Sequence, residues 1–153
     1  MVDVRWLDER EARAWRALQS MQMRLEAALG RQLADESELS LSDYAVLVSL
    51  TDRADGRLRL FELGQEIGWE KSRLSHHVAR MAGRGLVKKE TCDADRRGAF
   101  VVVTKKGRKA IEAAAPGHVA EVRRLVVDRL SRDELDAIAN AAETVLAALE
   151  TET

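Results

Sequence analysis

Residues 60–104 read LFELGQEIGWEKSRLSHHVARMAGRGLVKKETCDADRRGAFVVVT, and this stretch decides the fold. Its apolar residues first recur every three or four positions, which predicts two helices, over 60–67 and about 70–84. The period then shortens to two over 86–91 and 99–104, which predicts two strands joined by a charged hairpin loop. A helix, a short turn, a second helix and a two-stranded hairpin make up a winged helix-turn-helix.

The second of these helices has an apolar and a polar face. At about 100° per residue, Leu74, Val78 and Met81 share a stripe that should pack into the core, and His77 falls nearer that side. The opposite face is rich in hydrogen-bond donors and carries no carboxylate, which favours contact with the major groove of DNA over an ordinary solvated surface. The predicted DNA contacts of this recognition helix are Lys71, Ser72, Arg73, Ser75, His76 and Arg80.

Charge is segregated along the chain. Residues 57–109 carry 14 Lys and Arg against 6 Asp and Glu, a net charge of +8, whereas the segments before and after carry −4 and −5. The formal net charge of the whole chain is −1, so the basic segment is hidden in the total. A basic middle predicts contact with a polyanion, and the alternative is a solvated basic face without a partner.

Long amphipathic helices are predicted on both sides of the basic segment. One is expected over about residues 8–34, and Ser40 with Asp43 forms a start signal for the next. Pro116-Gly117 predicts a break between two later helices, and a capping box at residues 131–134 opens the last one. The apolar stripes of the terminal helices exceed what the small middle unit can cover, so we expect dimerisation to bury them.

The composition restricts the class of protein. With 153 residues, 46% of them hydrophobic and 33% charged, the chain fits one globular domain. No apolar run approaches the roughly 20 residues needed to cross a bilayer, and the first residues lack the basic start and apolar stretch of a signal peptide. We therefore expect a cytoplasmic protein without a membrane partner. No nucleophile–base pair, phosphate loop or metal motif stands out, so neither an enzyme nor a cofactor is expected.

Several motifs of the chain resemble the MarR family of bacterial transcriptional regulators. The resemblance covers about residues 39–109, whereas the acidic flanking helices match by architecture only. Its wing, Asp95-Arg96-Arg97-Gly98, is the most specific part. The other matching segments are Leu39–Leu47 in the second helix, Leu63–Trp69, Lys71–Val78 and Gly85–Val87 in the helix-turn-helix, and Thr104–Gly107 after the wing.

The resemblance implies one MarR-like domain over 1–153, with a mainly α fold and a small β-hairpin wing (α+β). A winged helix-turn-helix DNA-binding lobe would occupy residues 39–109, and residues 1–38 and 110–153 would form a helical dimerisation region. It implies a homodimer whose lobes each bind half of a near-palindromic double-stranded DNA operator. We therefore expect a sequence-specific transcriptional regulator, a repressor relieved by a small-molecule ligand. The alternatives are a DNA-architectural protein without sequence choice, and a small-molecule- or protein-binding module with an incidental basic lobe.

The resemblance also implies roles for individual residues. In the wing, Arg96 would enter the minor groove with Arg97 as a second DNA contact, and Asp93 or Asp95 would hold the wing by pairing with an arginine. A small aromatic or anionic effector would bind between the dimer region and the DNA lobes. The candidate residues for that pocket, each of which is also a candidate for plain packing, are Trp15, Met23, Tyr44 and Trp69.

Cys92 is the only cysteine, so an intrachain disulfide is excluded. At the start of the wing, a small filler is a more frequent role for a cysteine than a redox sensor. His76 and His77 are neighbours on a helix and diverge by about 100°, so they do not chelate a metal together. The sequence therefore predicts no metal site.

Overall fold

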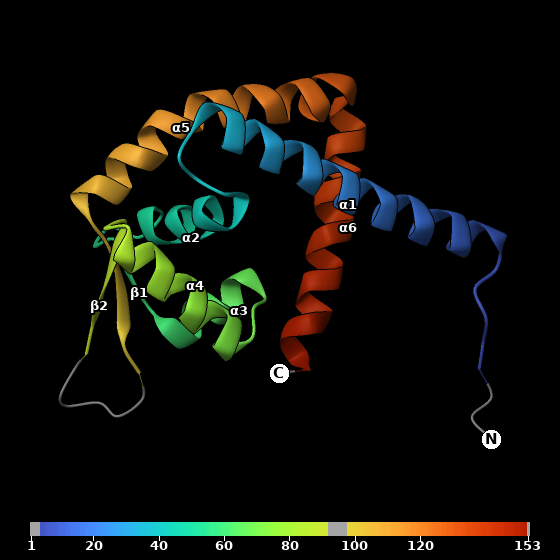
Figure 1. Cartoon of the computed structure of the whole chain (residues 1–153). Coiled ribbons are helices and arrows are strands. Elements are labelled where there is room, and N and C mark those ends of the chain that lie inside the picture. Colours follow the sequence, from blue (N-terminus) through green and yellow to red (C-terminus); the bar gives the residue numbers. More distant parts are fainter. Residues whose placement is uncertain (1–3, 92–97, 153) are drawn as a thin grey trace. The chain divides into compact units, whose positions relative to one another are not determined.

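The computed structural model describes residues 4–91 and 98–152 and divides into two compact units, Met1–His118 and Val119–Thr153. The fold is mainly helical with one small antiparallel sheet, as predicted (Figure 1). The first unit contains α1 (Glu9–Glu36), α2 (Leu41–Thr51), β1 (Arg57–Arg59), α3 (Leu60–Ile67), α4 (Lys71–Gly83), β2 (Val87–Glu90), β3 (Phe100–Val103) and most of α5 (Lys105–Leu125). The second contains the end of α5, the short helix η1 (Val127–Arg129) and α6 (Arg132–Thr151).

The three strands form an antiparallel sheet in the order β1-β3-β2 (Figure 1). The predicted hairpin of β2 and β3 is confirmed, with Val87 opposite Val103. On the other edge Leu58 of β1 pairs with Val101. The sequence does not predict β1, because three residues are too few to show an alternating pattern. Its pairing places two further arginines, Arg57 and Arg59, at the edge of the wing sheet.

The core of the first unit draws side chains from all its helices and from the sheet. The predicted stripe of Leu74, Val78 and Met81 on α4 is fully inside it, so the apolar face of this helix is confirmed. Other members of the same buried cluster come from α1, α2, α3, β3 and α5, in that order: Leu33, Leu47, Leu63, Val101 and Ile111. The buried face of α4 is therefore held by several elements at once, which fixes how the helix presents its other face.

Local signals set the ends of these helices. The predicted capping box at Ser40 and Asp43 opens α2, with the Asp43 N–H donating to Ser40 Oγ at 3.0 Å. A second predicted box, at Ser131 and Glu134, opens α6 in the same way. Gly68 ends α3 in the left-handed conformation, at φ 69°, which a residue with a side chain rarely adopts. The left-handed Gly68 therefore turns the chain between α3 and α4, the two helices of the helix-turn-helix.

The predicted break at Pro116-Gly117 is wrong. Helix α5 runs through Pro116, although a proline inside a helix removes one backbone hydrogen bond and typically costs about 3 kcal/mol. Tertiary packing explains the difference, because α5 buries Ile111 and Ala114 in the turns before it. A Cβ atom on Gly117 would lie 2.5 Å from a carboxylate oxygen of Glu36 on α1, so the glycine here permits a close approach between helices.

The base of the wing is attached to α5 through Thr104 and Gly107. The hydroxyl of Thr104 donates to the Gly85 carbonyl at 2.6 Å and accepts the Gly107 N–H at 3.0 Å, so Thr104 caps the start of α5. A Cβ atom on Gly107 would overlap the carbonyl oxygen of Leu86. Only glycine therefore fits where α5 crosses the chain that leads into β2.

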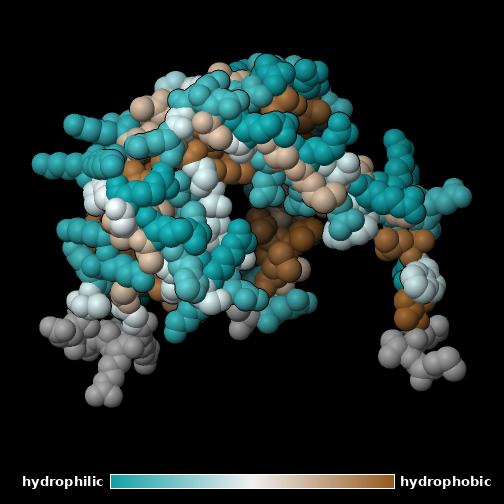
Figure 2. All heavy atoms as spheres, viewed as in Figure 1, coloured by the Kyte–Doolittle hydropathy of each residue, from teal (hydrophilic) through white to brown (hydrophobic). Residues whose placement is uncertain are grey.

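Large apolar side chains remain exposed on both units. Figure 2 shows them over α6 and near the start of the described chain. Helix α6 buries no residue in this monomeric structure, and four of its apolar side chains are about half exposed: Ile138, Val145, Leu146 and Leu149. On and before α1 the exposed apolar residues include Trp6, Leu7, Trp15 and Leu18.

Within the part of the chain that the structure describes, no helix is both long enough and apolar enough to cross a membrane.

Candidate nucleic-acid interface

Helix α4 separates its residues into two sets as the sequence predicts. Leu74, Val78 and Met81 are buried together with His77, whose position on the core side is thereby confirmed. The predicted DNA contacts lie on the other side: Lys71, Ser72, Arg73, His76 and Arg80 are exposed, and Ser75 is half-buried. No Asp or Glu lies between the first and last residues of the helix. The outer face is thus cationic and rich in donors, and its contact with DNA stays a prediction.

The turn before α4 holds Arg73 in place through Trp69. The guanidinium carbon of Arg73 lies 4.1 Å from the centre of the Trp69 ring, a cation–π contact. The same ring meets His77 edge-on, with ring centroids 5.3 Å apart and an interplanar angle of 87°. Trp69 therefore connects an exposed cation of the outer face to the buried face of the same helix.

A buried carboxylate, Asp43, lies under α4. Its Oδ2 accepts hydrogen bonds from Nη1 of Arg84 at 2.6 Å and from the Ser40 N–H at 3.0 Å. Its Oδ1 lies 2.9 Å from Nε2 of His77, and neither of these two atoms has an aligned hydrogen bond to any described residue. Arg84 also donates to the Glu38 carbonyl at 2.6 Å. The sequence identified Asp43 as a helix cap only, because its second role joins segments far apart in the chain.

The surroundings favour the ionised form of Asp43 and the uncharged form of His77. Burial acts to raise the pKa of Asp43, but the hydrogen bonds from Arg84 and the Ser40 N–H and the charge of Arg84 lower it below the usual 3.8, and His77 adds a smaller lowering when it is protonated. Burial lowers the pKa of His77 below 6.5, with help from Arg80 and Arg84, and outweighs the opposing attraction of Asp43.

The wing sheet adds cations that the sequence pattern does not place. The guanidinium carbons of Arg57 and Arg59 lie 3.9 and 4.9 Å from the centre of the Phe100 ring. Arg57 also comes within 3.8 Å of Glu90, and Lys88 lies 3.1 Å from the same carboxylate. Only the pairing of β1 with β3 shows that Arg57 and Arg59 belong to the wing sheet, and this pairing is seen only in the three-dimensional structure.

The tip of the wing lies outside the described residues. It contains the predicted DNA contacts Arg96 and Arg97, the predicted wing-structuring residues Asp93 and Asp95, and Cys92. Their roles stay predictions.

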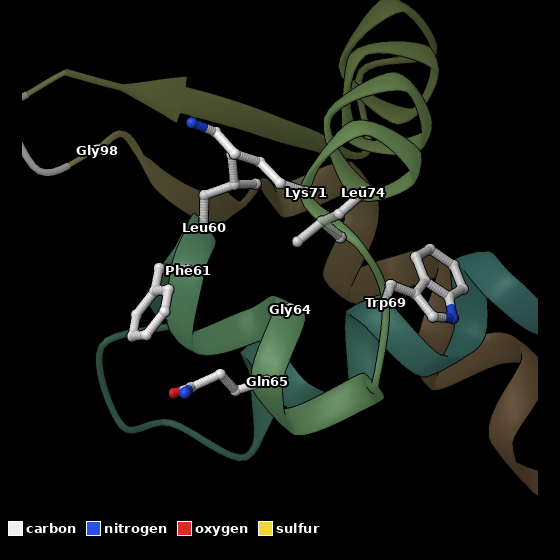
Figure 3. Close-up of a pocket in the computed structure, with 8 residues that line it drawn as sticks. All are labelled: Leu60, Phe61, Gly64, Gln65, Trp69, Lys71, Leu74 and Gly98. Atoms are coloured by element: carbon white, nitrogen blue, oxygen red, sulfur yellow. The ribbon is translucent and has the colours of Figure 1, made fainter. Parts of the chain in front are cut away.

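A cavity of about 740 Å³ lies between α3 and the start of α4. Figure 3 shows Phe61 and Gln65 projecting from α3, and Lys71 and Leu74 from α4. Its remaining lining residues are Leu60, Gly64, Trp69 and Gly98. The wall is largely apolar, and its polar side-chain groups are the Lys71 amine, the Gln65 amide and the Trp69 indole N–H.

Of the four predicted pocket residues, only Trp69 lines this cavity. Trp15 and Met23 lie on α1 and are 51% and 67% exposed. Tyr44 lies against His118, with ring centroids 4.3 Å apart, and His118 Nδ1 is 3.3 Å from Oε1 of Gln32. Burial raises the pKa of Tyr44 and lowers that of His118. The structure therefore does not gather the four residues around one cavity of the first unit.

Across residues 4–91 and 98–152, no group of three or more His, Cys, Asp or Glu side chains is arranged to hold a metal ion.

No protein-family model matches the chain. Similar proteins are found among curated sequences and among solved structures. The transcriptional regulator HosA of Escherichia coli is 35% identical over 80 residues, which are 52% of this chain. The match covers 57% of HosA, so the chain spans little more than half the length of the curated relatives it matches.

Two solved structures from Streptomyces coelicolor match over nearly the whole chain. AbsC, a MarR family transcriptional regulator, is 35% identical, with a TM-score of 0.88 over 97% of this chain and 99% of AbsC. Sco3205, a MarR family regulator crystallised in complex with DNA, is also 35% identical, with a TM-score of 0.90 over 97% of this chain and 93% of its own. The likeness thus includes the flanking helices as well as the winged lobe.

Proposed function

Because the chain belongs to the MarR family of transcriptional regulators, which are not enzymes, we propose that it is a homodimeric, sequence-specific DNA-binding repressor. The observation that carries the proposal is the exposed face of α4. This face offers several cations and hydroxyls and no carboxylate, on a helix whose other face is fixed in the core. A major groove admits one helix of this kind and presents acceptors to it. The complex of Sco3205 with DNA supports the same use of the fold.

In this proposal the wing and the helix contact different grooves. α4 reads base edges in the major groove, while Arg96, with Arg97 beside it, reaches the adjacent minor groove. A narrow A·T-rich minor groove concentrates negative potential around an inserted arginine. Arg57 and Arg59 at the edge of the wing sheet add positive charge on the same lobe.

The dimer part of the proposal rests on the exposed apolar residues of the two ends of the chain. So many large apolar side chains are rarely left exposed in a soluble monomer. A second copy of the chain would cover it through a two-fold interface, and would place two lobes on the two halves of a near-palindromic operator. We place this dimer in the cytoplasm, where DNA is accessible to it.

Selection from a library of random DNA duplexes tests the proposal. We expect the protein to enrich one near-palindromic sequence, and to bind that duplex at least about 1,000-fold more tightly than a scrambled duplex. The logarithm of the affinity should fall with the logarithm of salt concentration with a slope of several units, because basic residues displace counterions. Equal affinity for both duplexes would instead identify a DNA-architectural protein, and no binding to either would leave a small-molecule- or protein-binding module.

We further propose that a small aromatic anion relieves repression by occupying the cavity between α3 and α4. The apolar wall suits an aromatic ring, and Lys71 supplies a positive charge. Benzoate and cinnamate are suitable probes, with release of the selected duplex as the readout. Phe61→Ala alters the cavity wall on α3 and leaves α4 untouched. It should therefore weaken the effect of the probe and leave DNA affinity unchanged. Equal release from both proteins would place the effector elsewhere.

A further inference from the structure

We propose that His77 is a positioning residue for Arg80, and that Asp43 fixes the histidine in the tautomer which that task requires. This inference rests on the proposed function, because it concerns how a DNA-contacting arginine is oriented. The three residues form a line from the buried start of α2, through the inner face of α4, to its exposed face.

The line is visible in two contacts of the imidazole ring. Nη2 of Arg80 lies 3.2 Å from Nδ1 of His77, one helical turn away. On the other side of the ring, Nε2 lies 2.9 Å from Oδ1 of Asp43. Among the described residues, the contact with His77 is the only side-chain hydrogen bond that Arg80 makes.

These two contacts determine where the proton of the ring lies. A guanidinium group is always a donor, so Nδ1 must accept from Arg80 and cannot carry a proton. A neutral imidazole whose Nδ1 is unprotonated carries its proton on Nε2, and this nitrogen lies 2.9 Å from the Asp43 carboxylate, which favours a proton there. The geometry therefore points to one neutral tautomer of His77.

The carboxylate that faces Nε2 is itself held by other partners. Asp43 is 1% exposed, and its other oxygen is occupied by Arg84 and by the Ser40 N–H. The His77 ring also packs at right angles against the ring of Trp69, which holds Arg73 by a cation–π contact. These contacts restrict rotation of the imidazole, so its Nδ1 offers an acceptor at a defined place on the margin of the outer face.

An acceptor at a defined place matters because arginine is long and rotates freely. A hydrogen bond to one nitrogen leaves the other N–H donors of Arg80 for a base edge or a phosphate, and reduces the rotamer entropy lost on binding. Preorganisation of this kind improves affinity for one arrangement of acceptors over others. We therefore expect the contribution of Arg80 to sequence preference to depend on His77.

Two substitutions of His77 separate positioning from packing. His77→Asn places an amide oxygen near the site of Nδ1 and loses the contact with Asp43. His77→Gln keeps a donor near the site of Nε2 and loses the acceptor for Arg80. A purely structural role favours the Gln variant, because that variant keeps the buried contact, whereas positioning favours the Asn variant. Thermal unfolding of both variants verifies that they are folded.

The measurement uses the duplex that the wild-type protein selects from the random library, with a scrambled duplex for comparison. We expect His77→Gln to weaken binding to the selected duplex about 3- to 10-fold and His77→Asn to stay near wild type, since one hydrogen bond is at stake. Arg80→Ala should cost much less in the Gln background than in the wild type. Equal weakening by the Asn and Gln variants would overturn the inference. So would additive losses of affinity from His77→Gln and Arg80→Ala in the double variant.

Nitrogen NMR of the DNA-free protein tests the same relay independently. The ring nitrogens of His77 should show an unprotonated Nδ1 and a protonated Nε2 at neutral pH, and the opposite tautomer would overturn the inference alone. A wild-type protein that selects no duplex would remove the proposed function and this inference with it. A wild-type protein that binds its duplex with no coupling between His77 and Arg80 would remove only the inference.

Discussion

Asp43 and Arg84 join the start of α2 to the residue that follows α4, through a hydrogen bond of 2.6 Å between Nη1 and Oδ2 that spans 41 positions of sequence. The carboxylate side chain is 1% exposed and the guanidinium side chain 42%. One partner is therefore fully desolvated while the other still contacts water. Such a pair fixes the end of the recognition helix relative to the helix beneath it.

Removal of Arg84 should destabilise the first unit. In Arg84→Met the buried Asp43 carboxylate loses its strongest partner, and we expect a loss of about 2 kcal/mol in the free energy of unfolding, because water reaches the site and reduces the full penalty of a broken buried pair. Urea denaturation measures it. Arg53→Met is the matched control, since its pair with Glu66 is exposed on both sides and should be worth less than about 1 kcal/mol. Equal losses in the two variants would contradict the assignment.

Acid should destabilise the protein through two histidines. Burial lowers the pKa of His77 and His118 in the folded state below the 6.5 of the unfolded chain. As the pH falls below 6.5 the unfolded state takes up protons first, so the free energy of unfolding drops until the pH has passed through the folded pKa values. Denaturation curves at about pH 7.5 and about pH 5.5 measure this drop. His77→Gln and His118→Gln should each reduce it, and a protein that gains stability over this interval would refute the prediction.

Most of the fold follows from the sequence because its signals are local. The capping box at Ser40, the left-handed Gly68 and the change of period after α4 each act within a few residues. The break predicted at Pro116 is wrong for the opposite reason: the local preference of proline is overridden by the packing of α5. Strand β1 exists only through its pairing with β3, so no short window of sequence reveals it.

Gly107 should tolerate no side chain. In Gly107→Ala the new methyl group would meet the carbonyl oxygen of Leu86, and we expect a loss of about 3 kcal/mol in the free energy of unfolding as the wing base and α5 move apart. Gly30→Ala is the matched control, because this glycine is also in a helix and a Cβ there has nothing within 4 Å. The control should gain up to about 1 kcal/mol from helix propensity. Similar melting temperatures for the two variants would show that the contact at Gly107 relaxes freely.

Leu146→Glu should disrupt the proposed dimer. Leu146 is 56% exposed on α6 and belongs to its apolar stripe with Val145 and Leu149, so a charge there would enter the interface unpaired. Sedimentation should show monomer or aggregate. Asn140→Glu adds the same charge on the opposite side of the helix, at about 100° per residue, and should leave the dimer intact. An unchanged dimer in Leu146→Glu would place the interface elsewhere.

The candidate site is less predictable from sequence than the fold. The outward residues of α4 follow from the helical period, because the same period that buries Leu74 exposes Arg80. The residues that hold these outward side chains cannot be predicted in this way, because Asp43 lies far from His77 in the sequence. The capping signal at Ser40 and Asp43 already explains why an aspartate stands there, so nothing in the sequence points to its second contact. The pocket candidates, three aromatic residues and Met23, rest on residue type, which does not determine position, and only Trp69 among them lines the cavity between α3 and α4.

The buried and the exposed face of α4 have different functions, so we expect them to evolve at different rates. Core packing and the attachment to α2 involve Leu74, His77, Val78, Met81 and the residue after the helix, Arg84. The outer positions Ser72, His76 and Ala79 have no part in either. If α4 reads an operator as proposed, substitutions there change operator preference at little cost in stability, and duplicated copies of such a gene can diverge toward new promoters one residue at a time. A change at His77 would alter both functions at once, and we expect lineages to retain it longer than its exposed neighbour.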